Sequence, residues 1–186
     1  MAYHHGDARA ALLTAAAALL EREGAAGLSL RQVAEAAGLS RQAPYNHFAN
    51  KEAMLAELAA GGFRTLLARM SEIETELAPI KRLARAAHAY IGFGTEQPAV
   101  FRLMFTRELV DMRRYPGAQA EADAAMALLS AIVAEVVPAS KVADATLAAW
   151  SLVHGYTGLC VEAGIEGPAL RTERAALFAC AIAGLA

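Results

Sequence analysis

Apolar positions along the chain recur at the spacing of an α-helix in one segment after another. Over about residues 7–23 the apolar side chains share one face, and Gly24 and Gly27 then interrupt the pattern. The residues of that face are Ala11, Leu12, Ala15, Leu19 and Leu20. The same spacing, punctuated by glycine and proline, predicts further helices over about residues 51–77, 79–95, 98–105, 117–136, 141–164 and 170–185, the first of them capped by Asn50. The alternation of period two that is typical of half-buried strands does not occur. The pattern therefore predicts an all-α chain.

Two short helices between residues 29 and 48 predict a helix–turn–helix. Ser29 is a good helix-capping residue, and Gln32 three positions later completes the pattern of a capping box. Gly38 suits the left-handed backbone conformation that ends many helices. The apolar side chains between these ends share one face: Leu30, Val33, Ala34 and Ala37. The first helix of the motif is therefore expected to end at a tight turn.

The second helix of the motif is expected to begin at about Arg41 and to close on the core at Phe48. Pro44 fits in its first turn, because backbone amides there lack helical partners anyway. The remaining face consists of Arg41, Gln42, Ala43, Tyr45, Asn46 and His47. Side chains with such hydrogen-bonding tips have no reason to be buried together.

The second helix of a helix–turn–helix lies in the major groove of DNA, with its first residues against the base edges. Arg41 can pair with guanine and Gln42 with adenine. Asn46 lies one turn beyond Gln42; it either reaches a base or a phosphate, or is a solvated surface amide. These side chains are the ones that can specify a DNA sequence.

This segment resembles the DNA-binding domain of the TetR family of bacterial transcriptional regulators. The residues that carry the resemblance are SLRQVAEAAGLS at 29–40, Tyr45, His47, Phe48, Lys51, Glu52 and Leu55. The resemblance implies sugar–phosphate contacts for Tyr45 and His47. It also implies phosphate contacts for Ser29 or Arg31, and for Lys51 where the next helix begins. The predicted DNA-binding residues are Ser29, Arg31, Arg41, Gln42, Ala43, Tyr45, Asn46, His47 and Lys51.

A second constellation lies near the C-terminus, where Trp150 and His154 share a helix face ahead of Gly155. The stretch AWSLVHGYTGL at 149–159 resembles the ligand-binding region of the TetR branch named for its Trp–His–Gly motif. Either Trp150 and His154 line a ligand pocket, or they are a core anchor and a buried histidine bonded to a backbone carbonyl.

The resemblance implies a pocket for a small-molecule effector between the C-terminal helices. The candidate lining residues are Phe63, Leu67, Met70, His88, Phe93, Phe101, Met104, Phe105, Trp150 and His154. Aromatic and methionine side chains at helical spacing are also typical of an ordinary core. Methionine would give a pocket an adaptable apolar lining, and His88 and His154 are its candidate polar contacts. A mostly apolar ligand of unknown identity is therefore expected.

Composition and charge change this picture only slightly. The chain has 186 residues, is 56% hydrophobic and carries a net charge of −2. Residues 1–51 hold five Lys or Arg and four Asp or Glu, a faint positive balance that counts mildly against DNA binding. Cys160 and Cys180 lack metal-ligand spacing and are expected to be buried free thiols or, alternatively, a redox switch. No pairing of a nucleophile with a base is evident, so no catalytic residue, metal site or cofactor is expected.

The sequence therefore predicts a cytoplasmic homodimeric repressor with about nine to ten helices and no membrane segment. Residues 1–50 would form a three-helix DNA-binding domain, and residues 51–186 a larger helical ligand-binding and dimerisation domain. The helices at 117–136 and 141–164 are rich in small residues and would pair across the dimer. Each copy would then present its DNA-binding domain, here called the reading head, to one half of a palindromic operator in double-stranded DNA. Gly61 and Gly62 are either a soft point for ligand-induced motion or a packing contact. The alternative is a helical ligand- or protein-binding dimer that does not bind DNA.

Overall fold

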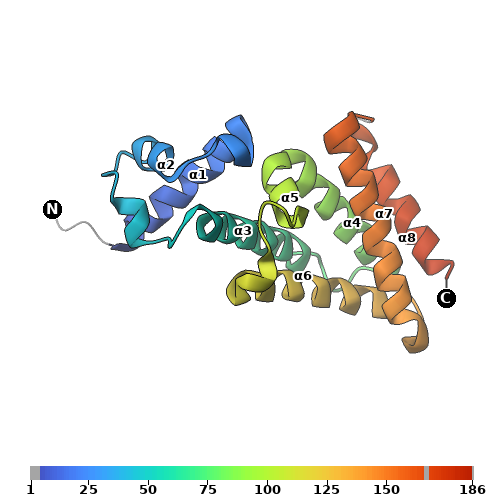
Figure 1. Cartoon of the computed structure of the whole chain (residues 1–186). Helices are drawn as coiled ribbons and strands as arrows, with labels where there is room; N and C mark the ends of the chain where they lie inside the picture. The colour runs from blue at the N-terminus through green and yellow to red at the C-terminus, as the bar shows by residue number, and fades with distance from the viewer. Residues whose placement is uncertain (1–4, 166–167, 186) are drawn as a thin grey trace. The chain divides into compact units, whose positions relative to one another are not determined.

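Over residues 5–165 and 168–185, the ranges that the computed structural model describes, the chain forms helices joined by turns and loops, with no strand among them (Figure 1). The prediction of an all-α fold is confirmed. The α-helices are α1 (His5–Gly27), α2 (Leu30–Ala36), α3 (Lys51–Ser71), α4 (Pro79–Glu96), α5 (Pro98–Phe105), α6 (Pro116–Ala134), α7 (Val142–Ala163) and α8 (Arg171–Ala183). Short 3-10 helices are η1 (Ala43–Asn46), η2 (Met112–Arg114), η3 (Ala139–Lys141) and η4 (Pro168–Leu170). No helix within the described ranges is long and apolar enough to cross a membrane.

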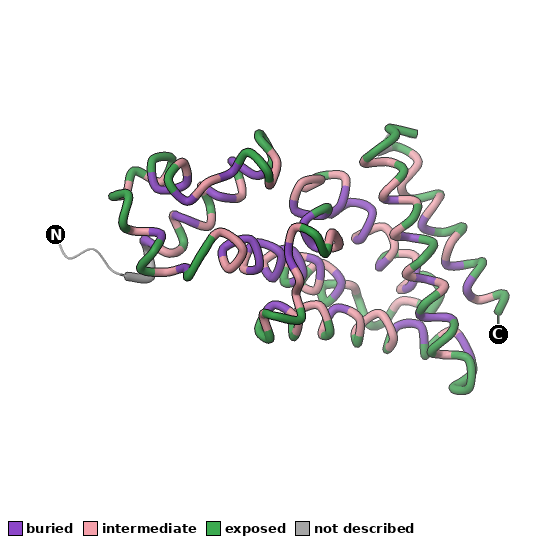
Figure 2. The backbone as a smooth tube through the Cα atoms, in the orientation of Figure 1, coloured by how far each residue is buried: buried purple, intermediate pink, exposed green. Residues whose placement is uncertain are grey.

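The helices belong to two compact units, each with its own buried residues (Figure 2). Unit 1 contains the chain up to Gly62 together with Ala99–Glu121. Unit 2 contains Phe63–Pro98 together with the chain from Ala122 onwards. The predicted functional boundary after residue 50 is a different kind of division, and it stays a prediction.

In unit 1, α1 buries Leu12, Ala16 and Leu20 along one face. This face is turned slightly from the expected one, since Ala15 is only half-buried. Gly24 adopts φ +71° and ψ 171°, which interrupts the helix where the sequence predicts its end. Residues other than glycine rarely adopt that backbone conformation, so glycine is the natural residue there.

In unit 2, α4 packs against both α7 and α8. Small residues such as Ala149 on α7 and Ala179 on α8 are buried and allow close approach. The buried Thr157 hydroxyl donates to the Val153 carbonyl at 2.6 Å, so its polar group is satisfied within the helix. Cys180 is free and exposed on α8, which corrects the expectation that it is buried.

The helix predicted over 51–77 ends earlier, since α3 stops at Ser71. Glu72, Glu74 and Glu76 follow, and acidic side chains are unfavourable at the negative end of a helix dipole. The Ser71 hydroxyl also donates to the Leu67 carbonyl at 2.8 Å. These local effects outweigh the apolar spacing that suggested a longer helix.

Candidate nucleic-acid interface

Ser29 caps α2. Its backbone is extended, with φ −133° and ψ 151°, and its Oγ accepts a hydrogen bond from the Gln32 amide at 3.3 Å. The Ser29 hydroxyl also donates to Gln32 Oε1, and Gln32 Nε2 donates to Glu23 Oε2 at 3.2 Å. The predicted cap is confirmed, although the glutamine contacts the serine hydroxyl and not its backbone amide. Ser29 is left half-buried at the start of the helix, and Arg31 is exposed beside it.

The turn after α2 depends on Gly38, whose φ is +66°. The Gly38 amide donates to the Glu35 carbonyl at 3.1 Å, and the Leu39 amide donates to the Ala34 carbonyl at 2.9 Å. This pair of bonds is the Schellman arrangement, which needs a left-handed residue at the position of the glycine. The predicted helix end is therefore confirmed.

The chain after this turn forms the 3-10 helix η1, where the sequence predicts an α-helix from Arg41. The difference has a local cause in Pro44, which has no N–H to donate to the Ser40 carbonyl. The Ala43 amide donates to that carbonyl instead, at 2.9 Å, and the tighter turn continues. The predicted position of Pro44 in the first turn holds.

Two apolar side chains fix this segment to unit 1, because Pro44 and Phe48 are buried. Between and before them, polar side chains lie at the surface. Tyr45 is 55% exposed, a large value for an aromatic side chain. Ala43 and His47 are half-buried, and the exposed members of the set are Arg41, Gln42, Tyr45 and Asn46. The buried Pro44 and Phe48 side chains therefore hold the backbone of this segment in place, with the polar side chains exposed on it.

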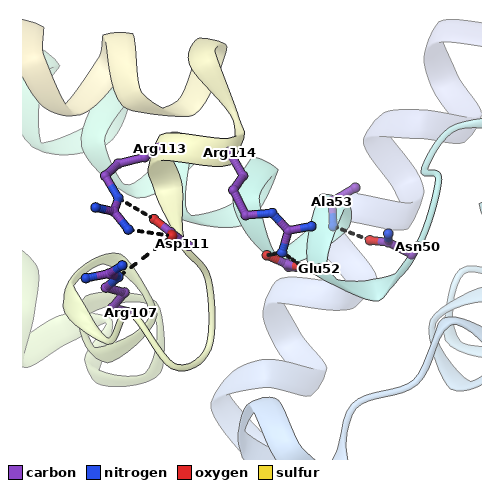
Figure 3. A network of polar contacts seen from close by, with 7 residues as sticks. All are labelled: Asn50, Glu52, Ala53, Arg107, Asp111, Arg113 and Arg114. Carbon is purple, nitrogen blue, oxygen red and sulfur yellow. Dashed lines mark hydrogen bonds and ion pairs between the residues drawn. The ribbon is translucent and has the colours of Figure 1, made fainter.

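The N-terminus of α3 completes the surface. Asn50 Oδ1 accepts from the Ala53 amide at 2.8 Å, which caps the helix as predicted (Figure 3). Lys51 Nζ donates to the Ala26 carbonyl at 3.4 Å, a long bond that leaves the ammonium half-exposed. A cation at a helix N-terminus adds to the attraction of the helix dipole for an anion such as phosphate. All nine predicted DNA-binding residues thus belong to unit 1, and their contacts with DNA stay predictions.

Arg9 supports this surface from α1 through contacts that the sequence pattern does not indicate. Its guanidinium lies 5.6 Å from the centroid of the Phe48 ring and forms an ion pair with Glu57 at 2.8 Å. The ion pair and the cation–π contact hold Phe48, and with it the end of η1, against α1 and α3.

The predicted ligand-pocket residues divide between the units. In unit 1, Phe101 and Met104 are buried and Phe105 is half-buried, with the two phenyl rings 5.3 Å apart. In unit 2, the buried members are Phe63, Met70 and Phe93, and the half-buried members are Leu67, His88, Trp150 and His154. Burial of these side chains fits a core as well as a pocket lining, so the pocket stays a prediction.

Tyr90 is a buried polar residue of unit 2 that the sequence pattern did not indicate as part of a site. Its hydroxyl lies 2.8 Å from His154 Nδ1 and also forms a hydrogen bond with the Trp150 side chain. Burial raises the pKa of Tyr90 and lowers the pKa of His154 from 6.5. Thus His154 bonds a tyrosine hydroxyl, a partner that neither sequence-based alternative includes. A buried tyrosine usually finds such a partner, but its position 64 residues away gives no local signal.

Charged and polar side chains of α4 also contact Arg171 on α8. Arg171 donates to Glu96 Oε1 at 3.0 Å and to the Thr95 hydroxyl at 3.1 Å. Burial, reinforced by the charges of Arg171 and Arg85, lowers the pKa of His88 below 6.5. Both effects favour the neutral form of the His88 imidazole.

Comparison with known proteins places this geometry in a family. Residues 12–58 match the family of bacterial regulatory proteins of the tetR type, and residues 83–185 match the tetracyclin repressor-like C-terminal domain. The second match alone covers more than half of the chain. The chain belongs to the TetR family.

Individual relatives agree with this assignment. The uncharacterised HTH-type transcriptional regulator YobS of Bacillus subtilis is 28% identical over 157 residues, which cover 83% of this chain and 80% of YobS. A protein of unknown function from Rhodococcus sp. RHA1 has a similar structure, with a TM-score of 0.80, 29% identity and coverage of 98% and 96% of the two chains. The transcriptional regulator FadR of Bacillus subtilis, solved in complex with stearoyl-CoA, has a TM-score of 0.75 at 16% identity over 91% and 96%.

This TetR-family chain is accordingly a DNA-binding transcriptional regulator, and its relatives are regulators and not enzymes. Members of the family bind small-molecule effectors. The helix–turn–helix identified from the sequence lies within the first matched region. The assignment to the Trp–His–Gly branch stays a prediction, since the C-terminal match is to a tetracyclin repressor-like domain.

Proposed function

We propose that this TetR-family regulator is a homodimeric repressor that binds a palindromic operator and releases it when a small, mostly apolar effector binds. The observation that carries the proposal is the exposed polar face of η1, held over the buried Pro44 and Phe48. A backbone that is already fixed loses little freedom on binding, which favours specific recognition. We place the protein in the cytoplasm, where bacterial DNA lies.

The exposed face divides by chemistry into base and backbone contacts. Arg41 and Gln42 are exposed at the start of the segment and carry the groups that pair with guanine and adenine, each pair worth about 1–3 kcal/mol of discrimination. Tyr45 and His47 would contact the sugar–phosphate backbone. Asn46 is exposed at the end of η1 and would contact either a base or a phosphate.

Phosphate contacts on either side would set the register of the protein on DNA. Ser29 and Arg31 lie at the N-terminal end of α2, and Lys51 at that of α3, so backbone amides and cations act together. Ala43 is half-buried beside Arg41 and offers a methyl group that suits the thymine methyl.

Exposed leucines support a dimer through α7 and α8. Leu147 and Leu159 on α7 are 59% and 53% exposed, and Leu177 on α8 is 55% exposed. On α7, Ser151 and Gly155 lie between the two leucines at four-residue spacing, and a Cβ added at Gly155 would meet no atom within 4 Å. A helix of a second copy can therefore approach there. This favours α8, in place of the helix predicted over 117–136, as the partner of α7.

A twofold dimer explains why the operator would be a palindrome. Two reading heads related by symmetry contact two equivalent half-sites, separated by one turn of DNA or roughly 35 Å. One head alone reads too few base pairs to select a site in a genome.

The effector would act by favouring a spacing that no longer matches the operator. It must bind the released arrangement more tightly, because equal affinity for both arrangements shifts nothing. A coupling of about 1–3 kcal/mol is typical. The apolar side chains Phe93 and Met70 support an effector with a large apolar part, and the structurally similar FadR was solved with stearoyl-CoA, whose stearoyl chain is apolar.

Selection from random duplex DNA with the purified protein tests this proposal. It is run at one stated salt concentration near the physiological value, because affinity for DNA depends steeply on salt. We expect a palindrome to be enriched, and we expect the double variant Arg41→Ala/Gln42→Ala to lose tight binding to it. Arg22→Ala, which removes another exposed arginine of unit 1, is the matched control and should bind normally.

Failure to enrich any sequence would favour the alternative of a helical ligand- or protein-binding dimer. The faint positive balance of residues 1–51 is the observation on its side. Equal losses on operator and on unrelated DNA would instead mean that Arg41 and Gln42 contact only phosphate.

A further inference from the structure

Glu21 on α1 caps the N-terminus of α5, which lies 78 residues further along the chain. The Ala99 amide donates to both carboxylate oxygens, at 3.2 and 3.1 Å, and the Val100 amide donates to Oε1 at 3.2 Å. Pro98 precedes them and has no N–H, so these are the first two amides that α5 offers. A carboxylate there also interacts favourably with the helix dipole. Glu21 thus caps α5 from a distant part of the chain.

Glu52 on α3 binds the other end of the same segment. Both carboxylate oxygens of Glu52 accept a hydrogen bond from Arg114 Nη1, each at 3.1 Å (Figure 3). Burial, together with the charge of the Glu52 carboxylate, raises the pKa of the Tyr115 hydroxyl. The segment 99–115 is therefore attached at both ends to helices that carry the reading head, through Glu21 and Glu52. We call this pair of attachments the Glu21–Glu52 clasp.

Between its two ends the segment is only partly packed on the head. An open cavity of about 530 Å³ is bordered by Ala25 and Ala26, by Lys51 and Leu55, and by residues of the stretch Arg107–Arg114. Apolar packing does occur near the start of the segment, where Val100 and Met104 lie against Gly62. Apolar contacts tolerate small sliding movements of one helix on another. Hydrogen bonds to two amides form only when the carboxylate and the helix keep one relative orientation. The clasp is the part of the attachment that fixes orientation.

We propose that Glu21 and Glu52 are positioning residues through which operator binding and the placement of α5 influence each other. This rests on the proposed operator binding. DNA contacts made by η1 and by the start of α3 fix the orientation of the head helices, including α1, and so fix the Glu21 carboxylate over α5. By linkage, whatever releases α5 from the clasp weakens the preference of the head for its DNA-bound orientation to the same degree.

Hydrogen exchange of the Ala99 and Val100 amides gives a direct readout of the clasp. The probe is the duplex recovered by selection from random DNA, added to the full-length protein. In the wild type, DNA should slow exchange at these two amides about fivefold, which corresponds to about 1 kcal/mol. In Glu21→Ala their exchange should be faster from the outset, and DNA should change it by less than about twofold.

Three further variants separate coupling from simple stabilisation. Glu21→Gln keeps an acceptor of the same reach and should recover part of the DNA-dependent slowing. Arg114→Ala breaks the attachment at Glu52 without altering α3, and should halve the slowing or more. Glu35→Ala removes an exposed charge from α2 and is the matched control, which should behave as the wild type.

The outcomes can be told apart. Equal slowing by DNA in the wild type and in Glu21→Ala overturns the inference and leaves the cap purely structural. Binding of the duplex by the wild type without any slowing at Ala99 and Val100 also overturns it. A wild type that binds no duplex refutes the proposed function, and the inference falls with it. If Glu21→Ala does not fold, Glu21→Gln and Arg114→Ala carry the test, with the same results required.

Discussion

Replacing Gly62 with alanine tests how closely α5 packs on α3. A Cβ at this position would lie 2.5 Å from Met104 Sδ and 2.8 Å from Val100 Cγ1. Both distances are shorter than a normal contact, so a neighbour has to move. The thioether of Met104 is flexible and can turn away. Val100 is β-branched and stiff at χ1, and its movement requires a shift of α5 itself.

Two opposing terms set the expected magnitude. Overpacking a well-filled site costs about 1–3 kcal/mol. Alanine in place of glycine inside a helix contributes about 1 kcal/mol in the other direction. We therefore expect Gly62→Ala to lower the free energy of unfolding by about 0–2 kcal/mol. Gly117→Ala on α6 is the matched control in the same unit, since a Cβ there meets no atom within 4 Å, and it should be neutral or stabilising by up to about 1 kcal/mol.

Urea unfolding followed by circular dichroism measures both variants. The decisive comparison repeats Gly62→Ala in a Val100→Ala background, where the stiff neighbour is gone. There the alanine should cost nothing or should stabilise the protein, giving a coupling energy of about 1–2 kcal/mol. If Gly62→Ala stabilises the wild type as much as Gly117→Ala does, the packing argument is wrong. The interpretation of Gly61 and Gly62 as a soft point of the helix would then be the better one.

Three other outcomes follow from the polar contacts. Tyr90→Phe should lower the free energy of unfolding by about 1–3 kcal/mol, because it leaves the partners of a buried hydroxyl unsatisfied; a loss below about 0.5 kcal/mol in urea unfolding would contradict this. Because burial lowers the pKa of His154 from 6.5, its contribution to stability is complete above that pH and is lost as the pH falls through the lower folded pKa. Thermal melts between about pH 5 and 7.5 should show this loss, and His154→Gln should reduce the slope. The Arg113 hydrogen bonds hold the pKa of Asp111 at about 2, below the ordinary 3.8, so an NMR titration of Arg113→Ala should return the midpoint toward 3.8.

The parts of the reading head that the sequence predicted correctly depend on neighbours in the chain. The Ser29 cap, the left-handed Gly38 and the Asn50 cap each join residues no more than a few positions apart. Their geometry follows from backbone groups that every helix end leaves without partners. Residue type and spacing therefore suffice to predict them.

The form of the recognition segment was predicted less well. Pro44 was correctly placed in a first turn, but its missing N–H tightens that turn to the 3-10 helix η1. On α1 the buried face includes Ala16 where the spacing indicated Ala15. In an alanine-rich helix many faces have nearly the same hydrophobicity, so packing against other helices decides which one is buried.

By itself the sequence determined that this chain is helical, where most of its helices begin and end, and that a helix–turn–helix lies near its N-terminus. These properties arise from local spacing and from capping, and both act within a turn or two. Only the tertiary structure decided that Glu21 caps α5, that Arg114 binds Glu52, and that Tyr90 bonds His154. Each of these contacts joins residues more than 60 positions apart. Such a contact exists because packing brings two helices together, and no pattern within either helix indicates its partner.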